Sequence, residues 1–186
     1  FEFKPLPNLV QASPVFGTAV CDINGDGYQD LYMVQNFFGP QPETGNMDGG
    51  VSLLLLGSKG GNFSVVSPQI SGLIVPDAAT SVTINYINND DKPDFIVGIN
   101  NDRPKVFINR TKHEIDVIKF NYLSKKKNFF GTKVWLYFDN GFVQSHEISS
   151  SASYLSQSAP IIFFKKDLKK SKLEYIRIRW PDGGAE

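Results

Sequence analysis

The sequence predicts an all-β protein, and three observations support this fold class. First, 16 Gly and 11 Pro divide the 186 residues into short segments joined by turns. Second, these segments are rich in β-branched and aromatic residues, which favour strands. Third, we find no helical periodicity that extends beyond a turn or two. With 41% apolar and 20% charged residues, the chain is expected to fold around a sizeable core.

Strand-like segments follow one another along the whole chain. Each has an apolar or alternating pattern and is bounded by Gly, Ser, Pro, Asn or Asp. In the first half they are residues 19–21, 31–35, 51–56, 62–66, 80–86 and 94–98. In the second half they are residues 115–122, 132–138, 142–148, 161–164 and 173–180, with a hairpin turn at Asp139-Asn-Gly141.

Two segments of the first half resemble each other and form an internal repeat. The repeat aligns Asp30 with Asp94, and each of these residues follows an acidic turn between two apolar strands. Each repeat contains four short strands, which is the number of strands in a β-propeller blade. Two blades cannot close a ring, so the sequence predicts a partial propeller, with further blades of the same parent chain upstream.

The first acidic turn has the pattern of a calcium loop. Side-chain oxygens stand at alternate positions, and Gly27 permits the sharp reversal that directs them to one centre. The predicted ligands are Asp22, Asn24, Asp26, the carbonyl of Tyr28, and Asp30. An EF-hand is excluded because its bidentate Glu is replaced by Met33 and the flanking segments look like strands. The alternative is an Asx-type turn that needs no ion.

This loop resembles the FG-GAP, or VCBS, repeat family, the calcium-bearing blades of integrin-type propellers. Asp22, Asn24, Asp26, Gly27 and Asp30 match the family's loop positions one for one. The second loop departs from the family, since Tyr86 replaces the first acidic ligand and Asp91 the turn glycine. A weaker second cation site, or a turn without an ion, is therefore expected at Asn88, Asp90, the carbonyl of Lys92, and Asp94.

The second half contains three characteristic blocks in order, at residues 130–134, 154–158 and 180–183. Together they resemble the ASPIC/UnbV family, a small domain that follows FG-GAP repeats in secreted proteins. The charge also changes sign: residues 1–104 carry 11 acidic and 4 basic residues, whereas residues 105–186 carry 8 and 15. We therefore expect propeller blades in residues 1–110, and a small β-sandwich or barrel-like domain, C-terminally incomplete, in residues 111–186.

The expected function is a non-enzymatic, calcium-binding adhesion or binding module. His113, His146 and Cys21 form no local catalytic motif, and the basic residues lack the interleaved aromatics of a nucleic-acid site. No apolar run is long enough for a membrane span. An unknown protein or glycan is the expected ligand, and the location extracellular, periplasmic or cell-surface. The alternative is an accessory or glycan-binding domain of an extracellular enzyme whose catalytic part lies elsewhere.

Overall fold

The computed structural model describes residues 1–112, 115–119, 129–149, 153–164, 167–168 and 171–185. Parts of several predictions lie outside these ranges. They are His113 and Glu114, close to the predicted domain boundary, the end of the strand expected at residues 115–122, and some of the basic residues considered above for a nucleic-acid site, the lysines at 125–127, 165–166 and 169–170. Within the described residues the chain is all-β, as predicted, and its one α-helix is a single turn, α1 (Pro68–Ser71).

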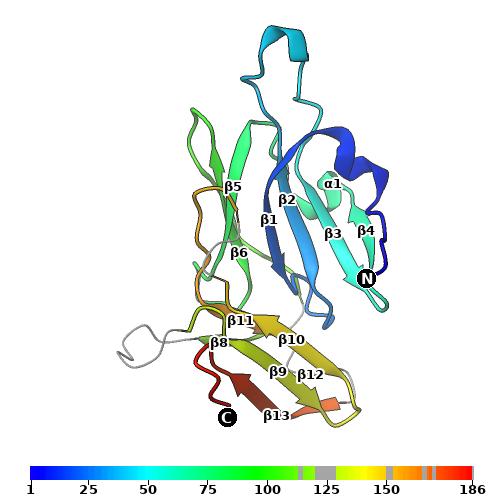
Figure 1. Cartoon of the computed structure of the whole chain (residues 1–186), viewed down its shortest axis with the longest axis vertical. Coiled ribbons are helices and arrows are strands. Elements are labelled where there is room, and N and C mark those ends of the chain that lie inside the picture. Colours follow the sequence, from blue (N-terminus) through cyan, green and yellow to red (C-terminus); the bar gives the residue numbers. More distant parts are fainter. Residues whose placement is uncertain (113–114, 120–128, 150–152, 165–166, 169–170, 186) are drawn as a thin grey trace.

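Two antiparallel sheets form the first half of the molecule (Figure 1). The first sheet has the order β1-β2-β3-β4, and the second has the order β5-β6-β7. Short 3-10 helices, η1 (Asn8–Ala12) and η2 (Pro42–Thr44), lie before β1 and between β2 and β3. The strands are β1 (Val15–Cys21), β2 (Asp30–Gln35), β3 (Leu53–Ser58), β4 (Asn62–Val66), β5 (Ala79–Asn85), β6 (Asp94–Ile99) and β7 (Lys105–Phe107).

The backbone pairing of the first half repeats with the same spacing as the sequence. The β1–β2 and β5–β6 pairs have the same register, and each has one irregularity near the start of its first strand. Such an irregularity bends the strand and strengthens its twist. The matching pairs are Cys21↔Asp30 with Asn85↔Asp94 and Thr18↔Met33 with Val82↔Val97, and the matching irregularities fall at Val15/Gly17 and Ala79/Ser81.

The two sheets pack face to face around one apolar core. Ala19, Tyr32 and Val34 of the first sheet meet Val82 and Phe95 of the second, and these side chains are almost completely buried. The opposite face of the first sheet is also apolar, and Leu6 and Val10 pack against it. The expected four strands per repeat are present in the first sheet, but the second has three in the described residues. A closed propeller or barrel is not seen in the described part of the chain.

The second half contains a four-stranded sheet, β10-β9-β13-β12, and a two-stranded ribbon, β11-β8. The ribbon packs on the sheet through Val134 and Leu136 on one side and Ile162 and Phe164 on the other. The hairpin predicted at Asp139–Gly141 joins β9 to β10. The strands are β8 (Asp116–Lys119), β9 (Lys133–Phe138), β10 (Val143–Glu147), β11 (Ile161–Phe164), β12 (Asp167–Leu168) and β13 (Ser171–Arg179). No helix in the described ranges has the length and apolar character that a bilayer crossing requires.

Candidate metal centre

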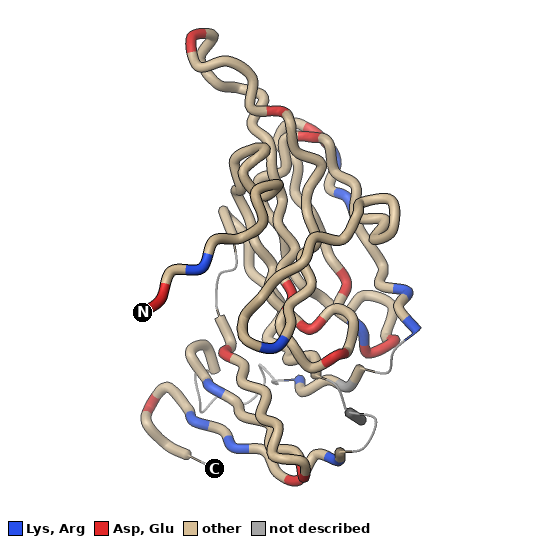
Figure 2. Tube along the Cα trace, turned by 90° about the vertical axis from the view of Figure 1, so that its right-hand side faces the viewer, with Lys and Arg blue, Asp and Glu red and all other residues tan. Residues whose placement is uncertain are grey.

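The predicted calcium loop connects β1 to β2 at the end of the first half that faces the second half (Figure 1). The second acidic loop, between β5 and β6, lies at the same end, because β5 and β6 repeat the geometry of β1 and β2. Figure 2 shows acidic segments gathered at this end of the first half, above the strands of the second half. Both acidic loops therefore lie at the end of the first half that faces the second half.

Asp22 organises the first part of the loop from its position directly after β1. One carboxylate oxygen accepts the backbone N–H of Asp26 at 3.0 Å, and the other accepts that of Gly27 at 2.8 Å. Asp26 repeats the arrangement one turn later, since its Oδ1 accepts the N–H of Tyr28 at 2.9 Å. The Asn24 side chain bonds both to the N–H of Asp26 and to its carboxylate. These bonds hold the loop in a tight reversal with its oxygens along the inner side.

Asp30 joins the loop to the neighbouring strands. Its two carboxylate oxygens accept the N–H groups of Ile23 and Gly57, each at 2.8 Å, and the side chain is completely buried. Gly57 must be glycine here, because a Cβ at this position would lie 2.1 Å from the carbonyl oxygen of Gln29. The end of β3 thus packs directly against the loop backbone, and Asp30 fixes both.

The first loop buries two carboxyl groups, Asp22 and Asp30, without a basic partner among the described residues. Burial, with further contributions from the charges of Asp26 and Asp30, raises the pKa of Asp22 to about 7. Burial likewise raises the pKa of Asp30 to about 6, although its bonds from Gly57 and Ile23 oppose this shift. Burial is also the main cause of the raised pKa of Cys21, so this thiol stays protonated and is a poor nucleophile. A bound cation would relieve the cost of these buried carboxylates.

The donor set has the chemistry that Ca²⁺ prefers, since all five predicted ligands offer oxygen. A carboxylate oxygen that accepts one N–H still has a free lone pair, so the loop bonds do not exhaust Asp22, Asp26 or Asp30. In the described part of the chain, however, no three His, Cys, Asp or Glu side chains converge as a metal cluster. The residues fit a calcium ion by donor type, and the ligand set remains a prediction.

The second loop keeps the backbone form of the first without its glycines. Asn89 and Asp91 have positive φ angles of 61° and 59°, and they occupy the repeat positions of Gly25 and Gly27, whose φ values are 70° and 97°. Asp94 repeats the role of Asp30, because it accepts the N–H groups of Ile87 and Asn109 at 2.9 Å each. The turn bonds of Asn88 and Asp90 are also repeated, to the N–H groups of Asp90 and Lys92.

The second loop differs from the first in its ligand chemistry. Tyr86 stands in place of Asp22, and its ring lies beneath the Lys119 ammonium group, with Nζ 3.6 Å from the ring centroid. The Lys92 side chain bonds to the carbonyl of Thr111, and Asn88 and Asp90 are exposed. With one acidic ligand fewer and more solvent, this loop is the weaker candidate, as the sequence also indicated.

Contacts between the first loop and its surroundings include residues that the sequence analysis did not single out. The Tyr28 ring makes an edge-on contact with Phe142 beside the β9–β10 hairpin, at 5.7 Å between centroids. The Asn109 amide donates to the carbonyl of Ile23 at 3.1 Å and so connects the end of the second repeat to the first loop. Neither contact has a local sequence signal, because the partners lie far apart along the chain.

The described residues form an all-β fold in which two similar acidic loops lie at the end of the first half that faces the second half. A family model described as ASPIC and UnbV matches residues 123–186, about a third of the chain. This match covers the part of the second half from which the resemblance was inferred. No curated protein matches the chain.

Proposed function

We propose that the chain is a non-enzymatic binding module whose first half is stabilised by Ca²⁺ at the Asp22–Asp30 loop. The observation that carries this proposal is the burial of Asp22 and Asp30, whose pKa values burial raises, beside Asp26 and without a basic partner among the described residues. An Asx-type turn would explain the hydrogen bonds. It would not explain why the fold buries two carboxyl groups without a basic partner among the described residues.

The module combines FG-GAP-type blades with an ASPIC/UnbV-like domain and belongs to a secreted, periplasmic or cell-surface protein. The repeated register of β1–β2 and β5–β6 supports the blade assignment, and the family match supports the second domain. Millimolar Ca²⁺ outside the cytoplasm suits a loop of this kind. A cation that binds only the folded state stabilises it. The added free energy of unfolding grows with the logarithm of one plus the cation concentration divided by its dissociation constant.

The test compares thermal unfolding in excess Ca²⁺ and in chelator for the wild type, Asp26→Ala and Asp90→Ala. Asp90 is the matched control because it occupies the equivalent position in the second loop and makes the same turn bond. We expect Ca²⁺ to raise the melting temperature of the wild type and Asp90→Ala, and to have little effect on Asp26→Ala. A wild type that melts identically in both conditions would contradict the proposal. A reduced Ca²⁺ response in Asp90→Ala would assign a cation to the second loop as well.

A further inference from the structure

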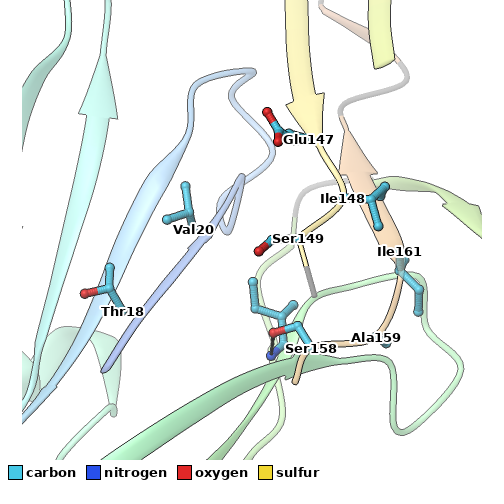
Figure 3. Close-up of a pocket in the computed structure, with 9 residues that line it drawn as sticks. Thr18, Val20, Glu147, Ile148, Ser149, Ser158, Ala159 and Ile161 are labelled. Atoms are coloured by element: carbon cyan, nitrogen blue, oxygen red, sulfur yellow. Dashed lines mark hydrogen bonds between the residues drawn. The ribbon is translucent and has the colours of Figure 1, made fainter. Parts of the chain in front are cut away.

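The second half contacts the first half through residues 153–159, which lie along the edge of β5. Ser153 Oγ accepts the N–H of Val82 and donates to its carbonyl, both at 3.0 Å. A cavity of about 370 Å³ lies between β1 and the end of this segment, with Ser158 and Ala159 on its wall (Figure 3). This side of the second half is therefore engaged by the chain itself.

The four-stranded sheet of the second half has one covered face and one open face. Val134 and Leu136 of β9 are completely buried and point to the ribbon β11-β8. The residues that alternate with them point the other way, together with their register partners on β13. We call the six side chains on this side of β9 and β13 the outer platform, which consists of Lys133, Trp135, Tyr137, Tyr175, Arg177 and Arg179.

The outer platform is accessible to solvent. Tyr175 is 52% exposed, the three basic side chains are exposed, and the other two rings are half-buried. A cavity of about 280 Å³ lies beside the platform, and Trp135, Ser145 and Glu147 contribute to its wall. Ser145 is the register partner of Trp135 on β10 and belongs to the same face. This face therefore presents aromatic rings, cations and a hollow together.

Contacts within the platform hold its aromatic side chains in place. The rings of Tyr137 and Tyr175 stack across the two strands, with centroids 4.4 Å apart and planes 12° from parallel. The guanidinium carbon of Arg177 lies 5.8 Å from the centroid of the Trp135 ring. Side chains that are already ordered lose less entropy when a ligand binds, so these contacts favour binding.

The platform has an excess of positive charge. Lys133 Nζ lies 3.2 Å from Glu147 Oε2, so these two charges offset each other. Arg177 and Arg179, by contrast, form no ion pair within the described ranges. The two arginines are two residues apart on one strand and share a face, and each guanidinium presents a fork of donors that matches a carboxylate. The platform therefore complements a ligand that carries spaced carboxylate groups.

We propose that the outer platform binds an acidic polysaccharide, whose uronic acid carboxylates pair with Arg177 and Arg179. Tyr and Trp side chains combine an apolar body with a polar edge, which suits sugar rings with their apolar C–H faces and hydroxyl groups. A single strand of nucleic acid fits less well, because bases stack on open ring faces. Here the rings of Tyr137 and Tyr175 face each other, and Arg177 lies over Trp135. The inference rests on the proposed role as a binding module and names its ligand class, but it does not depend on the calcium loop.

The test measures binding of a short, fluorescently labelled oligomer of galacturonic acid to the full chain by fluorescence anisotropy. Chelator is present, so that Ca²⁺ cannot bridge the sugar to the acidic loops. The wild type should bind this oligomer saturably, and should bind a galactose oligomer of the same length, which lacks carboxylates, much more weakly. Arg177→Gln should weaken binding of the acidic oligomer by roughly tenfold and reduce its salt dependence, because a charge-assisted hydrogen bond is lost. Arg103→Gln is the matched control, because Arg103 is exposed in the first half, and it should bind as the wild type does.

Tyr175→Ala tests the aromatic part of the platform. This variant should weaken binding several-fold while the salt dependence stays that of the wild type, because the lost contact is uncharged. Far-UV circular dichroism checks that each variant is folded.

Three results would overturn the proposal. The first is the absence of binding by a folded wild type. The second is equal affinity of the wild type, Arg177→Gln and Tyr175→Ala, which would place the sugar elsewhere. The third is tighter binding of a single-stranded DNA oligomer or a polyglutamate peptide than of the acidic sugar, which would replace the ligand class. None of these results would alter the Ca²⁺ response of melting, so failure of this site is distinct from failure of the calcium proposal.

Discussion

Asp30 and Asp94 provide the sharpest test of the equivalence between the two repeats. Each carboxylate accepts two backbone N–H groups, one from the start of its own loop and one from a residue in or just after the third strand of its sheet, Gly57 in β3 or Asn109 two residues after β7. Replacement of either residue by Ala leaves two backbone donors without acceptors. An unsatisfied buried donor costs about 1–3 kcal/mol, so two donors give about 2–6 kcal/mol.

We expect the lower part of this range, about 2–3 kcal/mol, for both variants. For Asp30→Ala, the loss is offset because the variant also removes a carboxylate whose pKa burial raises to about 6. For Asp94→Ala, the donors of Ile87 and Asn109 are only partly buried, so water replaces some of the lost bonding. The two effects have different causes and a similar size.

Urea unfolding followed by far-UV circular dichroism, at pH 7 in chelator, measures these free energies without a contribution from Ca²⁺. The control is Asp48→Ala, because Asp48 is exposed, and a surface substitution of this kind changes stability by less than about 0.5 kcal/mol. If Asp30→Ala and Asp94→Ala both have the same free energy of unfolding as the Asp48→Ala control, the two carboxylates do not stabilise the loops. If only one of them is destabilised, the repeats are not equivalent at this position.

Two further predictions concern the second half. Burial lowers the pKa of His146 to about 4, so the unfolded chain takes up a proton near pH 6.5 while the folded chain does not. His146 alone should therefore lower stability as the pH falls from about 6.5 to 4, by up to about 1.4 kcal/mol per pH unit, while Asp22 and Asp30, whose pKa values are raised, act in the opposite direction. The stability of the wild type relative to His146→Leu should fall over this range in urea midpoints; a constant difference between the two proteins would exclude a contribution from His146. Phe142→Ala should speed limited proteolysis within the Asp22–Asp30 loop, because Tyr28 loses its ring contact. The control Tyr154→Ala, which removes an exposed ring, should not change the rate. Equal rates of cleavage in the wild type and both variants would show that the ring contact does not protect the loop.

Local patterns in the sequence were sufficient to predict most strands. The segments 62–66 and 161–164 coincide with β4 and β11, and the other predicted strands that the structure describes differ mainly at their ends. Alternating or continuous apolar residues identify a strand because they record which faces are buried. The internal repeat was visible for the same reason, since Asp30 and Asp94 follow similar local signals.

Roles that depend on distant partners were not predictable in this way. The serines between residues 153 and 158 carry no sequence signal for their partner, yet Ser153 and Ser158 bond to β5. A serine hydroxyl can form hydrogen bonds with water, a glycan or a protein backbone. Only the fold shows that Ser153 lies next to the backbone of Val82. Similarly, the ligand types of the calcium loop were apparent from its sequence, whereas the clamp from Asp30 to Gly57 requires the return of β3 to the loop.

The serine segment also affects the order in which the chain reaches its final form. During synthesis from the N-terminus, β5 leaves the ribosome about 70 residues before Ser153, at roughly 5–20 residues per second in general. For several seconds the backbone groups of Val82 and Ile84 therefore have no partner, and an open strand edge favours pairing between nascent chains. Residues 153–159 act late, as a cover that ends this exposure. A chain that stops near residue 110 would lack residues 153–159, and its β5 edge would stay exposed. The first half alone is therefore expected to aggregate more readily than the full chain.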